Sequence, residues 1–84
     1  MKKTWRSFEM DTLMNILTEI DSSIVWDQEN ALIDDRMLDS FDIISLVSEM
    51  EGAFDIEIEA SEMVPDNFNS VEAMRKMIVR LQGS

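Results

Sequence analysis

The sequence contains no cysteine and no histidine, and it has one proline and two glycines among 84 residues. Without cysteine the chain can form neither a disulfide bond nor a thiolate metal site, which suits a reducing cytoplasm, where we expect the protein to reside. Histidine and cysteine are also the side chains that most often transfer protons or attack carbonyl groups near neutral pH. We therefore expect that the chain is not itself an enzyme.

Basic residues are scarce as well, because seven lysines and arginines oppose eighteen acids and leave a formal net charge of -11. A field of that sign repels phosphate backbones and anionic lipid surfaces, so neither nucleic acid nor a membrane is an expected partner. No apolar run approaches the roughly 18 residues that a membrane span needs. The acids are dense between Asp34 and Asp66, where only Arg36 opposes them, and this window should attract basic protein surfaces.

Apolar residues at three- and four-residue steps predict helices and hence an all-α protein. The first helix should run from Phe8 to Ile20 with Ser7 as its N-cap. The second should start in the stretch LDSFD, residues 38–42, with Asp39 as its N-cap, and the last should follow Asn69 or Ser70. We expect a single domain, residues 1–84, with a core from about 8 to 81 and short tails.

The connecting segments predict one long loop and several short links. Residues 24–38 combine isolated apolar residues with acids and no sustained period, which indicates a long loop anchored by its apolar side chains. Residues 55–59 alternate as a strand would, but no second strand is available for pairing, so an extended connector is expected. Ala60 to Val64 should form one helical turn that Pro65 stops, and residues 66–69 should be a loop.

The acidic, methionine-rich composition raises the alternative of a calcium sensor. A calcium-binding loop that started at Asp55 would have oxygen ligands at Glu57 and Glu59. Ala60, however, would stand where the loop needs glycine, and Asp66 where it needs glutamate. The ligand pattern therefore predicts no metal site.

The stretch LDSFD places a serine between two acids at the expected start of a helix, and this pattern resembles the acyl carrier protein family. Those proteins are small acidic three- to four-helix bundles whose second helix opens with Asp-Ser-Leu, and Asp39-Ser40-Phe41 takes that place. The similarity continues in register at Asp42, Leu46, Val47, Glu51, Phe54, Asp55, Glu57 and Ile58, and Asn69-Ser70-Val71 is similar to the family's Thr-Val before its last helix. The resemblance implies an all-α bundle with a long loop between its first and second helices.

The resemblance also implies a cofactor and a set of partners. Ser40 would carry a covalent 4′-phosphopantetheine arm, derived from coenzyme A and attached by a phosphopantetheinyl transferase. The arm would hold acyl or aminoacyl groups as thioesters, which a loading ligase supplies and downstream enzymes use. A serine in the first turn of a helix suits this role physically, because unpaired backbone N–H groups and the helix dipole stabilise a phosphate there. We expect the carrier to be a monomer.

Two further groups of residues are candidates for this site. Asp39 and Phe41 would help the transferase recognise Ser40, and Asp42, Glu49 and Glu51 would meet basic partner surfaces. Phe41 should be unusually exposed for a large aromatic residue, which favours contact with a partner. In the family an acyl pocket opens between the second and third helices, and the candidates to line it are Ile44, Val47, Ile58, Met63 and Phe68.

The departures from the family pattern bear on which carrier this is. Fatty-acid synthase carriers usually show Gly-Ala before the Asp-Ser-Leu motif, where this chain has Met37-Leu38, and Phe41 replaces the leucine. The Leu-Asp-Ser start looks more like D-alanyl carrier proteins and other stand-alone carriers. A specialised lipid, polyketide, nonribosomal peptide or D-alanylation-like pathway is therefore expected. The other alternative is a carrier-like interaction module that is never loaded.

Overall fold

The computed structural model describes residues 5–83, which form helices joined by loops, with no strand in that range. The α-helices are α1 (Ser7–Ile20), α2 (Ser40–Phe54), α3 (Pro65–Phe68) and α4 (Val71–Gln82), and single 3-10 turns cover Trp26–Gln28 and Ala60–Glu62. This confirms the small all-α bundle with a long loop between its first two long helices. The predicted tails extend onto residues 1–4 and 84, which lie outside the described residues. Within residues 5–83, no helix is both long and apolar enough to cross a membrane.

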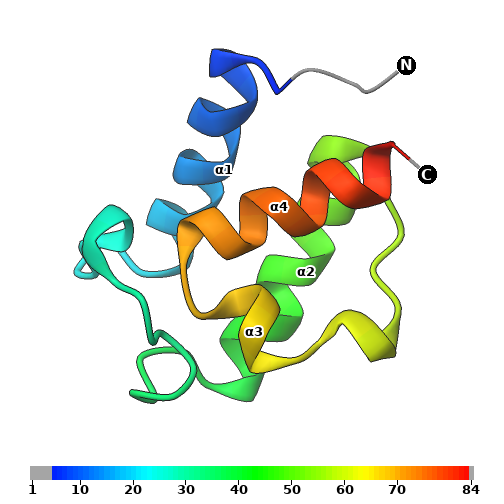
Figure 1. Ribbon diagram of the computed structural model, residues 1–84. Helices are drawn as coiled ribbons and strands as arrows, with labels where there is room; N and C mark the ends of the chain where they lie inside the picture. Colours follow the sequence, from blue (N-terminus) through cyan, green and yellow to red (C-terminus); the bar gives the residue numbers. More distant parts are fainter. Residues whose placement is uncertain (1–4, 84) are drawn as a thin grey trace.

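The bundle places the two ends of α2 in different surroundings. Helix α1 packs against α2, while α3 packs against α4, which crosses in front of α2 in Figure 1. The start of α2 lies at the bottom of that view, near α3 and the long loop. Its end lies near the top, beside the last turn of α4. The LDSFD stretch is thus at one end of the molecule, and the end of α4 is toward the other.

One apolar core joins all these segments, because each long helix contributes a stripe, α3 contributes Phe68, and the long loop contributes side chains as well. Trp26, Leu32 and Leu38 are the loop's buried anchors, so the prediction of a packed loop is confirmed. The remaining core residues are Leu13, Ile16, Leu17, Leu46, Val47, Met50, Phe54, Ile58, Phe68, Val71, Met74, Met77 and Ile78. Most of the loop's backbone is irregular, yet its apolar side chains fix it to the bundle.

Helix α1 begins one residue earlier than predicted, and Arg6 rather than Ser7 is its N-cap. The reason is Glu9, whose Oε1 accepts a hydrogen bond from the Arg6 backbone N–H at 3.2 Å. A glutamate that reaches back to the N-cap N–H satisfies one of the donors that a helix start leaves unpaired. Because this bond is available at Arg6, Ser7 becomes the first residue of the helix.

The segment after the connector also differs from the prediction. The turn at Ala60–Glu62 is present, but Pro65 does more than end it, since it begins the one-turn helix α3. Proline is favoured at the first helical position, where its missing N–H and fixed φ carry no penalty. The Asn69 N–H closes this turn on the Pro65 carbonyl oxygen at 2.9 Å. The prediction of a loop over residues 66–69 was therefore wrong for its first three residues.

Gly52 lies on the exposed side of α2, and we expect Gly52→Ala to stabilise the fold. A Cβ atom built at this position meets nothing within 4 Å, so alanine adds no clash. Glycine inside a helix is less favourable than alanine by about 0.5–1 kcal/mol, and the free energy of unfolding should rise by that amount. Urea denaturation monitored by circular dichroism would measure it. An unchanged or lower midpoint would mean that α2 is not helical at this point.

Candidate functional site

Ser40 is the first residue of α2 and its side chain is exposed. The Asp39 carboxylate caps the helix, because its Oδ1 accepts a hydrogen bond from the Asp42 N–H at 2.8 Å. The backbone N–H groups of Ser40 and Phe41 belong to the first turn and have no acceptor within the helix. An anionic group on the Ser40 hydroxyl would therefore lie beside free donors and the positive end of the helix dipole. These residues fit a phosphodiester-linked arm.

Apolar side chains are exposed on α2 near Ser40 and in the segment just before α3. Phe41 is 76% exposed, as predicted, and Ile44, one turn further along α2, is 64% exposed. Met63 and Val64, just before α3, also keep about two fifths of their surface in water, at 42% and 41%. Large apolar side chains exposed in one region of a small protein commonly mark a contact surface.

The acids proposed to meet basic partners differ in how exposed their side chains are. Asp39 and Glu49 are exposed, whereas Asp42 is half-buried. Glu51 is also half-buried, and its Oε2 accepts a hydrogen bond from the Ile58 backbone N–H at 2.9 Å. The Glu51 carboxylate thus holds the extended connector against α2, a role that its place among the acids of the sequence did not reveal.

A small apolar hollow of about 60 Å³ lies between α2, α3 and the long loop. It is lined by Ile33, Ile43, Met63, Val64, Pro65 and Phe68. Of the five predicted pocket residues, Met63 and Phe68 line this hollow. Val47 and Ile58 are buried in the core without lining it, and Ile44 is exposed. An engineered cavity of about 150 Å³ admits benzene, so this hollow has less than half of that room.

The loop that leads to Ser40 is held by Asn69, at the junction of α3 and α4. The Asn69 carbonyl oxygen accepts from the Leu32 N–H at 2.9 Å, and its Oδ1 accepts from the N–H groups of Ile33 at 2.9 Å and Asp34 at 3.2 Å. Its Nδ2 in turn donates to the Asp34 carboxylate at 3.1 Å. Asn69 was predicted only as a possible cap for α4. That cap is Ser70, whose Oγ accepts from the Ala73 N–H at 3.0 Å.

The loop then closes in a Schellman-type turn just before α2. The Met37 N–H donates to the Leu32 carbonyl oxygen at 2.9 Å, and the Arg36 N–H donates to that of Ile33 at 3.0 Å. Arg36 stands at the left-handed position of this turn, with φ 58°, where glycine is the usual residue. Because arginine is unfavourable in that conformation, no turn signal is visible in the sequence at this position.

The connector between α2 and α3 is tied to α4 by an ion pair. Two guanidinium nitrogens of Arg80 donate to the two carboxylate oxygens of Glu62, at 2.9 Å and 2.6 Å. These hydrogen bonds hold the pKa of the Glu62 carboxyl below its usual range. Asn67 adds a bond from its Nδ2 to the Glu62 carbonyl oxygen at 2.7 Å.

Within residues 5–83, no group of three or more carboxylates is placed to hold a metal ion.

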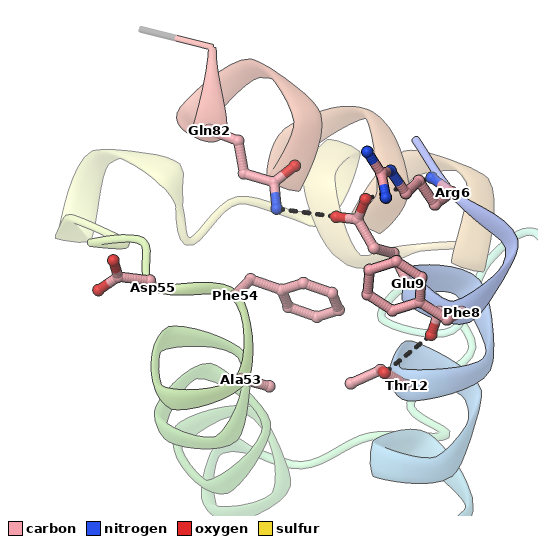
Figure 2. Close-up of a pocket in the computed structure, with 8 residues that line it drawn as sticks. All are labelled: Arg6, Phe8, Glu9, Thr12, Ala53, Phe54, Asp55 and Gln82. Atoms are coloured by element: carbon pink, nitrogen blue, oxygen red, sulfur yellow. Dashed lines mark hydrogen bonds between the residues drawn. The ribbon is translucent and has the colours of Figure 1, made fainter. Parts of the chain in front are cut away.

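A larger hollow, of about 430 Å³, lies at the opposite end of α2 from Ser40 (Figure 2). Arg6, Phe8, Glu9, Thr12, Ala53, Phe54, Asp55 and Gln82 line it. Glu9 is only 7% exposed, and its Oε2 accepts a hydrogen bond from the Gln82 Nε2 at 3.0 Å, which joins α1 to the last turn of α4. None of the predicted site residues lines this hollow.

Two curated proteins of Bradyrhizobium diazoefficiens are similar to this chain. Aminoacyl carrier protein 1 is 40% identical over 42 residues, which are 50% of this chain and 47% of that protein. Aminoacyl carrier protein 2 is 38% identical over 47 residues, 56% of this chain and 53% of that protein. The chain therefore matches about half the length of each relative.

No family model matches the chain. No solved structure matches it either. The likeness to known proteins thus rests on the two relatives, on the helical bundle and on the Asp39-Ser40-Phe41 start of α2. Both relatives are carrier proteins by name, and they confirm the resemblance of this chain to the acyl carrier protein family.

Proposed function

We propose that this chain is a stand-alone carrier protein that holds acyl or aminoacyl groups as thioesters on a 4′-phosphopantetheine arm attached to Ser40. The observation that carries the proposal is the exposed Ser40 in the first turn of α2, directly after the capping Asp39. The two relatives are named for aminoacyl cargo, which favours an aminoacyl group over a fatty acyl group here as well. The chain would act as a single carrier domain in the cytoplasm.

The chain's own part in loading is to present the Ser40 hydroxyl at the start of α2, which Asp39 caps. The Ser40 Oγ would attack the pantetheine-side phosphorus of the coenzyme A pyrophosphate, forming a new phosphodiester as the bond to the adenosine-side phosphate breaks. Adenosine 3′,5′-bisphosphate leaves, and the hydroxyl proton passes to a base of the transferase, since the chain has no histidine to accept it. Once bound, the arm supplies the thiol that the chain lacks. The free N–H groups of the first turn stabilise the new phosphate.

The surface around Ser40 suits basic partners with an apolar contact site. Phe41 offers an exposed ring, Asp39 and Asp42 lie close to it in the sequence, and the exposed Glu49 adds negative charge further along α2. Negative charge speeds the encounter with a basic transferase or loading ligase. The Glu51 carboxylate would contribute its charge while it keeps its bond to Ile58.

The small hollow between α2 and α3 supports the preference for a small cargo. At about 60 Å³ it has less than half the room of an engineered cavity of about 150 Å³ that admits benzene. A long acyl chain would not fit in it without movement of α3 or the loop. A small aminoacyl group needs no such shelter.

The proposal is tested by incubating the purified chain with coenzyme A, magnesium and a broad-specificity phosphopantetheinyl transferase. Intact-protein mass spectrometry should show the gain of one phosphopantetheine group. The loaded chain is then offered to ligases for amino acids and for fatty acids side by side, and we expect aminoacyl transfer. A chain that gains no mass while an established carrier in the same reaction does would contradict the proposal and favour the interaction module.

A further inference from the structure

We infer that Asn69 is a positioning residue for Ser40: it fixes the loop that delivers the serine to the transferase, although it lies 29 positions further along the chain. The inference rests on the proposed function and extends it to a residue outside the Asp-Ser-Phe motif. Its basis is a continuous series of contacts from Asn69 to the start of α2.

The first link is the side-chain amide of Asn69. Its Oδ1 accepts from the N–H groups of both Ile33 and Asp34, and its Nδ2 donates to the Asp34 carboxylate. The Leu32 N–H donates to the Asn69 carbonyl oxygen. One residue therefore satisfies three consecutive backbone donors of the loop, which otherwise has few regular hydrogen bonds.

The second link runs from this anchored segment to Ser40. Leu32 and Ile33, both fixed by Asn69, supply the carbonyl oxygens on which the Schellman-type turn closes at Arg36 and Met37. Leu38 follows and is buried in the core at 5% exposure. Asp39 then caps α2 through the Asp42 N–H. Hydrogen bonds and buried side chains thus connect the Asn69 contact to the helix that carries Ser40.

Loss of the Asn69 amide should therefore reduce the fraction of molecules whose loop is in the competent position. A partner that binds only the competent state has an apparent affinity lowered by that fraction. Once bound, the loop is in place and the transfer proceeds at its normal rate. The expected signature is a change in KM for the carrier with little change in kcat.

The central experiment compares Asn69→Ala with the wild type as substrates of the same transferase. We expect KM to rise about tenfold, as the loss of two or three hydrogen bonds to backbone and carboxylate would allow, and kcat to stay within about twofold. Amide hydrogen exchange on the unloaded chain should show faster exchange at Arg36, Met37 and Asp42. The second measurement does not depend on loading at all.

A rescue pair sharpens the test. Asn69→Asp keeps the Oδ1 acceptor but sets a second carboxylate against that of Asp34, in a contact of 3.1 Å, and should raise KM and hydrogen exchange. Adding Asp34→Asn restores a donor and an acceptor across the same contact, and both measurements should return toward wild type. The return of both measurements would assign the effect of Asn69→Asp to its contact with residue 34.

Asn67→Asp is the matched control. It makes the same change two residues away, where the Nδ2 donates to Glu62 rather than to the long loop. Its KM should stay near that of the wild type. Equal KM values for Asn69→Asp and Asn67→Asp, or unaltered exchange at Arg36 and Met37, would overturn the inference even if the wild type is loaded. A wild type that is never loaded would instead overturn the proposed function, and the exchange data would still decide whether Asn69 fixes the loop.

Discussion

Ser40→Ala is expected to abolish loading completely while it leaves the bundle folded. The hydroxyl is the attachment atom of the proposed arm, and no neighbouring side chain can replace it at the first position of α2. The cap of the helix is the Asp39 carboxylate, which the substitution does not touch. Alanine at the first turn should therefore change the free energy of unfolding by at most about 1 kcal/mol. Mass spectrometry and circular dichroism on the same sample would measure both results.

Ser45 and Ser48, on the same helix, provide the matched controls. Ser45→Ala and Ser48→Ala remove a hydroxyl from α2 but should leave the mass gain equal to that of the wild type. An equal gain on Ser40→Ala would show that the arm is attached elsewhere. Loss of helical signal in Ser40→Ala would instead indicate that Ser40 has a structural role.

Phe68→Ala should be among the most destabilising substitutions in the chain. Phe68 is 1% exposed, it is the buried residue of the single-turn helix α3, and its ring lines the hollow next to α2. Truncation of a buried phenylalanine to alanine typically costs about 3–5 kcal/mol, through lost burial and the cavity left behind. Domains of this size have only about 5–15 kcal/mol of stability in total. Thermal unfolding should show a large fall in the midpoint or a chain that is already partly unfolded at room temperature.

Phe41→Ala makes the same chemical change at a position that is 76% exposed. Its free energy of unfolding should stay within about 0.5 kcal/mol of wild type, because little buried surface is lost. Similar losses for the two variants would mean that Phe41 is packed in solution or that Phe68 is not.

The features that the sequence predicted correctly are local ones. Asp39 caps α2 and Ser70 caps α4 through contacts with residues three positions further on, and such spacing is visible in the sequence itself. The long helices follow from apolar periodicity in the same way. The exposed state of Phe41 was predicted from the family resemblance, in which this position belongs to a leucine that contacts partners.

The features that the sequence did not reveal depend on residues that meet only in the folded chain. Asn69 binds a loop 35 and 36 positions earlier, and nothing near it in sequence indicates that contact. The bond from the Ile58 N–H to Glu51 requires the connector to turn back along α2. The one-turn helix at Pro65 was missed for another reason, since a proline both ends one turn and can begin the next.

The size of the hollow between α2 and α3 has a consequence for the lifetime of any cargo. A group too large for about 60 Å³ would remain in solvent, where its thioester is accessible both to water and to partner enzymes. Such a carrier would present its cargo directly to partner enzymes but would not protect it from water. Its loading would have to be matched in time to the enzyme that consumes the cargo.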